Sequence, residues 1–319
     1  MRKGRALCKI PWKIMKFLLT SRWFWSTIVK HVMKRFCRTQ CDFSTLFFGG
    51  FTMKRIYFPL IALGLGLIGF FLRMQQLSVA LSPSTGMPIL HHPYSYALIA
   101  LTIVGVLLLF FLSFFVANEA QDWYSAYHAD PPLQGLEFLS AAAFLVGTGM
   151  IFRTLFLTYQ SNGGGNFLVV LFQTQPFLLF LGILSLCATA AILFMVLRNG
   201  DSGSWSLAPL IPGFTSCVWL VLTYHSNASN PSVMSFAWQV FAVSSAALAW
   251  YFTASFAFQF PRPQAATWFS LLTVMLCLIA LADSVELYQK VLLAATALWF
   301  LVRSILLIDN AEYSGKHMG

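Results

Sequence analysis

The sequence predicts an all-α integral membrane protein with about eight transmembrane helices, arranged as four sequential hairpins in an N-in/C-in orientation. Hydrophobic residues fill 58% of the 319 positions and charged residues fill 9%, whereas soluble domains have about 45–50% apolar and about 25% charged residues. The apolar residues lie in runs that match the thickness of a bilayer, and turn-forming residues separate these runs. The composition excludes a disordered chain, a disulfide-stabilised domain and a nucleic-acid-binding domain.

Eight apolar runs define the predicted spans. A bilayer core about 30 Å thick needs about 20 residues at a rise of 1.5 Å each. The runs are continuously apolar rather than alternating, which favours helices over barrel strands. Clusters of Pro, Gly, Asn and Ser lie between them, for example at 82–86 and 162–166. The predicted helices are 56–77, 94–117, 136–158, 172–197, 207–225, 234–258, 264–282 and 287–308.

The distribution of Lys and Arg predicts the orientation. Cationic residues near the ends of spans favour the cytoplasmic side. With the N-terminus inside, three cations lie outside (Arg73, Arg153 and Lys290) and six lie inside (Lys54, Arg55, Arg198, Arg262, Arg303 and Lys316). We therefore expect a multi-pass protein of the cell membrane with both ends in the cytoplasm.

Residues 1–53 differ from the rest of the chain. They carry eleven of the 20 Lys and Arg residues against one Asp, so they account for the whole net charge of +10. One interpretation is a basic amphipathic helix on the membrane surface. Another is a translated leader before a true start at Met53, and a cleaved signal peptide fits poorly because Arg22 interrupts the apolar run. The remainder, 54–319, is predicted to be a single polytopic membrane domain.

A short segment occurs twice. Residues 157–162 and 222–227 match at five of six positions and close the third and fifth predicted spans. Because the period equals one helical hairpin, the match suggests parallel hairpin duplication. Chance similarity between apolar helices is the alternative.

Five charged residues at the predicted outer level form the first candidate site. An intramembrane charge is costly unless it is paired or hydrated, so it indicates a functional site by default. One interpretation is an outward-facing polar pocket that holds an anionic ligand or headgroup. The other is structural pairing and snorkelling to lipid phosphates. The residues are Arg73, Arg153, Asp283, Glu286 and Lys290.

Three glutamines inside apolar runs form the second candidate set. Gln173, Gln175 and Gln239 are expected to hydrogen-bond between helices, each bond contributing about 0.6–2 kcal/mol. Substrate binding is the alternative. Pro176 marks a point where a kink would free backbone carbonyl groups.

No catalytic residue, metal ligand set or cofactor motif is predicted. The G-x-G-x-x-G pattern at 64–69 lies inside a membrane helix, where Ala62 and Gly66 suit close helix packing instead of dinucleotide binding. Cys37 and Cys41 lack a second pair at zinc spacing.

The sequence itself does not encode a specific function. We expect a non-enzymatic binding, assembly or sensing component. The alternatives are a secondary transporter or permease subunit and an intramembrane lipid-modifying enzyme. The expected partners are membrane lipid and other membrane proteins or a second copy of the chain, and nucleic acid is not expected.

Overall fold

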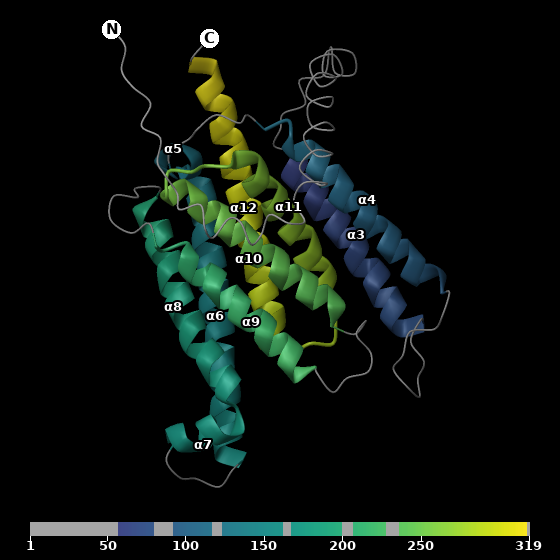
Figure 1. The fold of residues 1–319 in the computed structure, drawn as a ribbon, viewed down its shortest axis with the longest axis vertical. Helices are drawn as coiled ribbons and strands as arrows, with labels where there is room; N and C mark the ends of the chain where they lie inside the picture. The colour runs from purple at the N-terminus through teal and green to yellow at the C-terminus, as the bar shows by residue number, and fades with distance from the viewer. Residues whose placement is uncertain are drawn as a thin grey trace, which may run out of the picture. The chain divides into compact units, whose positions relative to one another are not determined.

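The computed structural model describes residues 57–79, 92–116, 123–161, 167–199, 207–227 and 236–317, and within these ranges all regular structure is α-helical (Figure 1). The prediction of an all-α multi-pass membrane protein is confirmed. The predicted surface helix or leader at 1–53 lies outside the described residues. The helices are α3 (Tyr57–Val79), α4 (Pro93–Ser113), α5 (Trp123–Tyr127), α6 (Pro131–Ser161), α7 (Phe167–Thr174), α8 (Pro176–Arg198), α9 (Leu210–Ser226), α10 (Ala237–Ala257), α11 (Pro263–Ala280) and α12 (Leu287–His317).

Seven of the described helices are long and apolar enough to cross a membrane, namely α3, α4, α6, α8, α10, α11 and α12. The predicted span at 207–225 corresponds to α9, which has 17 residues and is therefore about 25 Å long. Each predicted span thus has a helical counterpart in the structure. Several helices begin at a proline, because the fixed backbone of proline suits the first helical position, where the missing N–H costs nothing.

The predicted helix 172–197 is divided in two. Helix α7 ends at Thr174 and α8 begins at Pro176, while Gln175 between them has φ −143° and ψ 61°. The break has a local cause: the Pro176 ring disfavours helical backbone at the preceding residue, and Pro176 has no N–H to continue the hydrogen-bond ladder. The expectation of one continuous helix here is wrong, and Gln173 and Gln175 consequently lie before α8 rather than inside it.

The last hairpin, α11–α12, forms the centre of the bundle. Helix α11 packs against α3, α4, α10 and α12, and α12 packs against α5, α6 and α11. Burial reflects this central position. In an apolar 18-residue stretch of each of these two helices, 72% of the residues are buried, compared with 17% in α4. Figure 1 shows α3 and α4 side by side on one flank and α6 and α8 on the other.

Small residues permit the closest helix contacts. Ala62 is fully buried in α3, and Gly66 faces Leu278 and Met275 of α11. A Cβ atom at Gly66 would lie 2.6 Å from the Leu278 Cδ1 atom and 3.2 Å from the Met275 Cα atom. The expected role of Ala62 and Gly66 in close helix packing is confirmed.

A substitution at Gly66 tests this contact. We expect Gly66→Val to push α3 away from α11 and to destabilise the protein by about 1–3 kcal/mol, as overpacking does. Gly64→Val is the matched control, because a Cβ atom there meets nothing within 4 Å and the change in helix propensity is the same. Thermal unfolding in detergent, followed by circular dichroism, measures the difference. Equal midpoints for the two variants would contradict the packing described here.

Labelling of single cysteines tests the predicted orientation. Ser161 ends α6 and Ser226 ends α9. Ser125 lies in α5, which packs against the second half of α12, at the opposite end of the bundle. In a background without the native cysteines, we expect a membrane-impermeant maleimide to modify Ser161→Cys and Ser226→Cys on intact cells. Ser125→Cys should react only after permeabilisation. If the reagent modifies Ser125→Cys on intact cells but does not modify Ser161→Cys or Ser226→Cys, the orientation is opposite to the predicted one.

Candidate ligand pocket and its neighbouring ion pair

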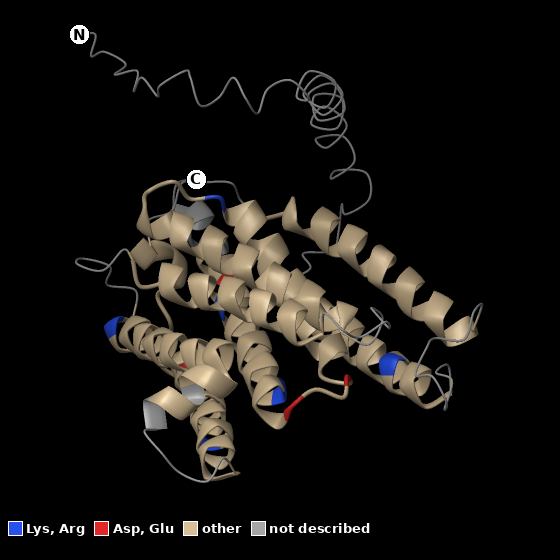
Figure 2. Ribbon diagram, turned by 60° about the horizontal axis from the view of Figure 1, so that its bottom comes forward, with Lys and Arg blue, Asp and Glu red and all other residues tan. Residues whose placement is uncertain are grey.

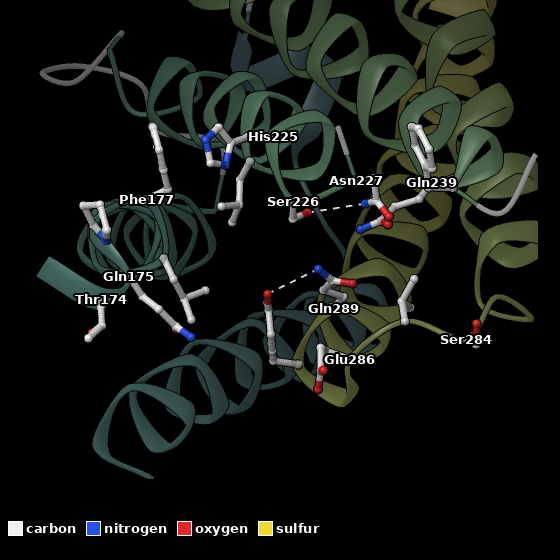
Figure 3. A pocket seen from close by; sticks show the side chains of 16 residues that line it. Thr174, Gln175, Phe177, His225, Ser226, Asn227, Gln239, Ser284, Glu286 and Gln289 are labelled. Carbon is white, nitrogen blue, oxygen red and sulfur yellow. Dashed lines mark hydrogen bonds between the residues drawn. The ribbon is translucent and has the colours of Figure 1, made fainter. Parts of the chain in front are cut away.

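A pocket of about 600 Å³ lies where α8, α10 and α12 begin and α9 ends (Figure 3). Ligand pockets typically measure about 300–1,000 Å³. Because the pocket is at one end of the helices, polar side chains can line it without lying in the middle of a span. Its lining consists of Thr174, Gln175, Pro176, Phe177, Leu178, Leu222, His225, Ser226, Asn227, Phe236, Gln239, Ser284, Val285, Glu286, Tyr288 and Gln289.

The polar part of this lining is mostly uncharged. Four side chains are amides: Gln175, Asn227, Gln239 and Gln289. The lining has one carboxylate, that of Glu286, and neither Lys nor Arg is among the sixteen residues. An anionic ligand would therefore find no Lys or Arg side chain in the wall.

Two amides in the wall have buried atoms without a hydrogen-bond partner. Gln239 lies in the first turn of α10 and is 2% exposed, and its Nε2 donor is unpaired. The Oε1 acceptor of Gln175 is also buried and unpaired. Figure 3 shows the two side chains on opposite sides of the pocket. A buried polar group without a partner costs about 1–3 kcal/mol, so a polar molecule in the pocket would stabilise these two atoms by pairing with them.

The local backbone explains why the Gln175 side chain is available. The Gln175 carbonyl accepts the Leu179 N–H at 3.1 Å, but the Gln175 side chain makes no capping hydrogen bond to α8. Pro176 at the first helical position has no N–H to cap. The amide of Gln175 is thus free to face the pocket.

Other contacts hold the walls together. The His225 ring of α9 packs against the Phe177 ring of α8 with centroids 4.5 Å apart. The Asn227 Nδ2 group donates to the Thr223 carbonyl at 2.9 Å. The ring contact holds the end of α9 beside the beginning of α8, and the hydrogen bond fixes Asn227 against the last turn of α9.

A buried ion pair lies directly before one wall of the pocket. The Arg73 Nε group of α3 donates to the Asp283 Oδ1 atom at 2.7 Å, and both side chains are 1% exposed. The Arg73 Nη1 group donates to Gln76 Oε1 at 2.7 Å, and Gln76 Nε2 donates to Ser95 Oγ at 3.0 Å. This chain joins α3 and α4 to the turn between α11 and α12, and the next residues of that turn, 284–286, line the pocket.

Burial also changes the acidity of Asp283. Desolvation raises the pKa of this carboxyl group from 3.8 to about 6, while the positive charges of Arg73 and Lys290 oppose the rise. Asp283 therefore changes charge near pH 6, next to the wall of the pocket.

The structure separates the five charged residues of the first candidate site. Arg73 and Asp283 form the ion pair, and Glu286 lines the pocket. Arg153 is exposed on α6 and Lys290 is half-buried on α12, and neither belongs to the lining. Figure 2 shows how few Lys, Arg, Asp and Glu residues the described helices carry.

The three glutamines also separate. Gln173 is exposed on α7, whereas Gln175 and Gln239 line the pocket. In the part of the chain that the structure describes, no side-chain hydrogen bond joins any of the three to another helix. Gln175 and Gln239 instead have the unpaired atoms described above.

Sequence reasoning missed a second buried ion pair, at the other end of α12. Arg303 Nε lies 3.0 Å from Glu137 Oε1 of α6, although Arg303 was expected at the cytoplasmic surface. The Arg303 guanidinium also lies over the Trp299, Tyr127 and Trp123 rings, at 4.5, 4.9 and 5.7 Å from their centroids. An acidic residue at the start of an apolar helix was the only local signal of this pair.

The pocket residues His225, Asn227 and Gln289 were also missed as a group. Residues 222–227, the second copy of the repeated segment, contribute four of the lining residues, whereas 157–161 of the first copy contribute none. The described residues contain no group of three or more His, Cys, Asp or Glu side chains that could hold a metal ion.

The titration of Asp283 can be measured directly. We expect the infrared band of a protonated carboxyl group to disappear with a midpoint at about pH 6 and to be missing in Asp283→Asn. In Arg73→Gln the midpoint should move upward, because the guanidinium charge lowers the pKa of Asp283. An unchanged midpoint in Arg73→Gln would contradict the coupling.

The same shift predicts a pH dependence of stability. The folded protein holds the Asp283 proton more tightly than the unfolded chain, so the Asp283 contribution to stability decreases as the pH rises from about 4 to about 6. Thermal midpoints of the wild type should fall relative to those of Asp283→Asn across this interval and stay parallel above it.

No protein family model, curated protein sequence or solved structure matches the chain. The pocket and the two buried ion pairs are the features from which a function can be inferred.

Proposed function

We propose that the protein is a binding component of the cell membrane that holds the polar part of a small ligand in this pocket, on the outer side. The observation that carries the proposal is the buried, unpaired amide of Gln239 in the wall of a cavity large enough for a ligand. The unpaired Gln175 oxygen on the opposite side supports it.

The lining favours binding over catalysis. Ser226 and His225, one nucleophile and base pair in the lining, are adjacent in one helix and are engaged elsewhere. The Ser226 hydroxyl donates to the Thr223 carbonyl at 3.2 Å, and the His225 ring packs on Phe177. Nucleophilic catalysis needs a nucleophile within hydrogen-bond reach of its base, and the described contacts contain no such pair.

The other half of the bundle favours binding at one end over passage through the protein. Trp250 of α10 packs against Trp299 and Phe300 of α12 with centroids 5.5 and 5.0 Å apart, and each ring is at most 2% exposed. The Glu137–Arg303 pair lies next to this cluster in α12. Transport by a secondary transporter would require these contacts to open, and an intramembrane enzyme would require a catalytic group, so both remain alternative proposals.

A thermal-shift experiment tests the proposal. The protein is placed in phosphatidylcholine nanodiscs and mixed separately with inorganic phosphate, choline or methyl glycosides (glucoside, galactoside and mannoside) at 50 mM. We expect at least one probe to raise the unfolding midpoint, since a ligand present at ten times its Kd stabilises the folded protein by about 1.4 kcal/mol.

Gln239→Met should abolish the shift, because methionine has a similar length but no N–H donor. The ligand-free variant should unfold at the wild-type temperature or above it, since an unpaired buried amide has been removed. Gln173→Met is the matched control and should keep the shift, because Gln173 is exposed outside the lining. If no probe shifts the wild type, or if Gln239→Met responds as the wild type does, the proposal is wrong.

A further inference from the structure

We infer that the ligand is a neutral, hydroxyl-rich group, such as a sugar ring, either free or as the headgroup of a glycosylated lipid. This inference rests on the proposed function and specifies the chemistry of the ligand. It follows from three properties of the lining: the unpaired hydrogen-bonding atoms, the charge of the wall and the aromatic rings.

The unpaired atoms require a ligand that both donates and accepts. Gln239 presents a free N–H donor and Gln175 a free carbonyl oxygen. A hydroxyl group satisfies either atom, because it has one O–H donor and two lone pairs. A quaternary ammonium group offers neither function, and a fully ionised phosphate only accepts.

The charge of the wall disfavours ions. The lining has no Lys or Arg, so an anionic ligand would meet no compensating cation. Glu286 is exposed and directly precedes α12, and within the described ranges no ion pair joins it to Lys290, in the first turn of that helix. An anion would therefore face an uncompensated carboxylate, whereas a hydroxyl group can donate to that carboxylate.

The helix ends at the pocket fit the same ligand. Helices α8, α10 and α12 begin there, so their partly positive N-termini favour oxygen lone pairs nearby. A single negative side chain, Glu286, balances this field at α12. Neutral hydroxyl oxygens supply lone pairs without bringing a net charge into a site whose lining contains no Lys or Arg.

Four rings complete the lining: Phe177, His225, Phe236 and Tyr288. One face of a sugar ring carries mainly C–H groups, which pack on aromatic faces, while the hydroxyl groups point outward to amide partners. A wall of four amides and four rings matches both parts of such a molecule.

Protection of a single cysteine tests the chemistry of the ligand. Ser284 is an exposed lining residue, so Ser284→Cys, in nanodiscs and without the native cysteines, reports access to the pocket by a methanethiosulfonate reagent. We expect at least one methyl glycoside of glucose, galactose or mannose to slow the modification at least fivefold. Tetrahydropyran, which has the same ring without hydroxyl groups, should not slow it.

Two further comparisons make the test specific. Adding Gln239→Met should remove the protection, and adding Gln173→Met should leave it intact. The octyl glycoside below its micellar concentration distinguishes the two sources. If the octyl glycoside protects at a tenfold lower concentration than the methyl glycoside, the ligand is a lipid headgroup. If the two glycosides protect at equal concentrations, the ligand is a free sugar.

The possible failures are distinguishable. Protection by inorganic phosphate or choline, without protection by any glycoside, would overturn the hydroxyl-rich ligand and leave the proposed binding function standing. Protection by tetrahydropyran as strong as that by the glycosides would also overturn it, since the hydroxyl groups would then be irrelevant. Absence of both protection and thermal shift with every probe would overturn the binding function and this inference together.

Discussion

The absence of water along the spans is the constraint on which this structure depends. Without water, each backbone N–H and C=O group must find its partner within the protein, and a helix satisfies them all locally. Polar side chains face the same requirement. Arg73 meets it with Asp283, and Arg303 meets it with Glu137 and a set of aromatic rings. Breaking one such pair would leave a buried charge, which costs about 3–5 kcal/mol.

The two ion pairs act at different places in the bundle. One joins α3 to the turn that leads into α12, and the other joins α12 to α6. Because α12 also packs against α11, these contacts connect the central hairpin to helices on both flanks. The pocket wall, by contrast, holds two amides, Gln175 and Gln239, that each have a buried atom without a hydrogen-bond partner.

The pocket and the Arg73–Asp283 pair are adjacent in the chain as well as in space. Asp283 is followed directly by Ser284, Val285 and Glu286, which form part of the pocket wall. A change in the charge of Asp283 would act on the turn that carries these residues. The pocket is therefore built on a segment whose anchor changes its charge near pH 6.

Local patterns in the sequence determined the fold class and the approximate spans, and the break at Pro176 also has a local cause, although one continuous helix was predicted there. Each of these features depends on the hydropathy or the backbone preferences of residues that are close together in the sequence. A stretch of about 20 consecutive residues is long enough to show them. Only the tertiary structure decided which polar residues meet. Arg73 and Asp283 are 210 positions apart, and Gln175, His225, Gln239 and Glu286 come from separate elements. Their meeting depends on the side-by-side order and rotation of whole helices, and continuously apolar spans carry little local information about either.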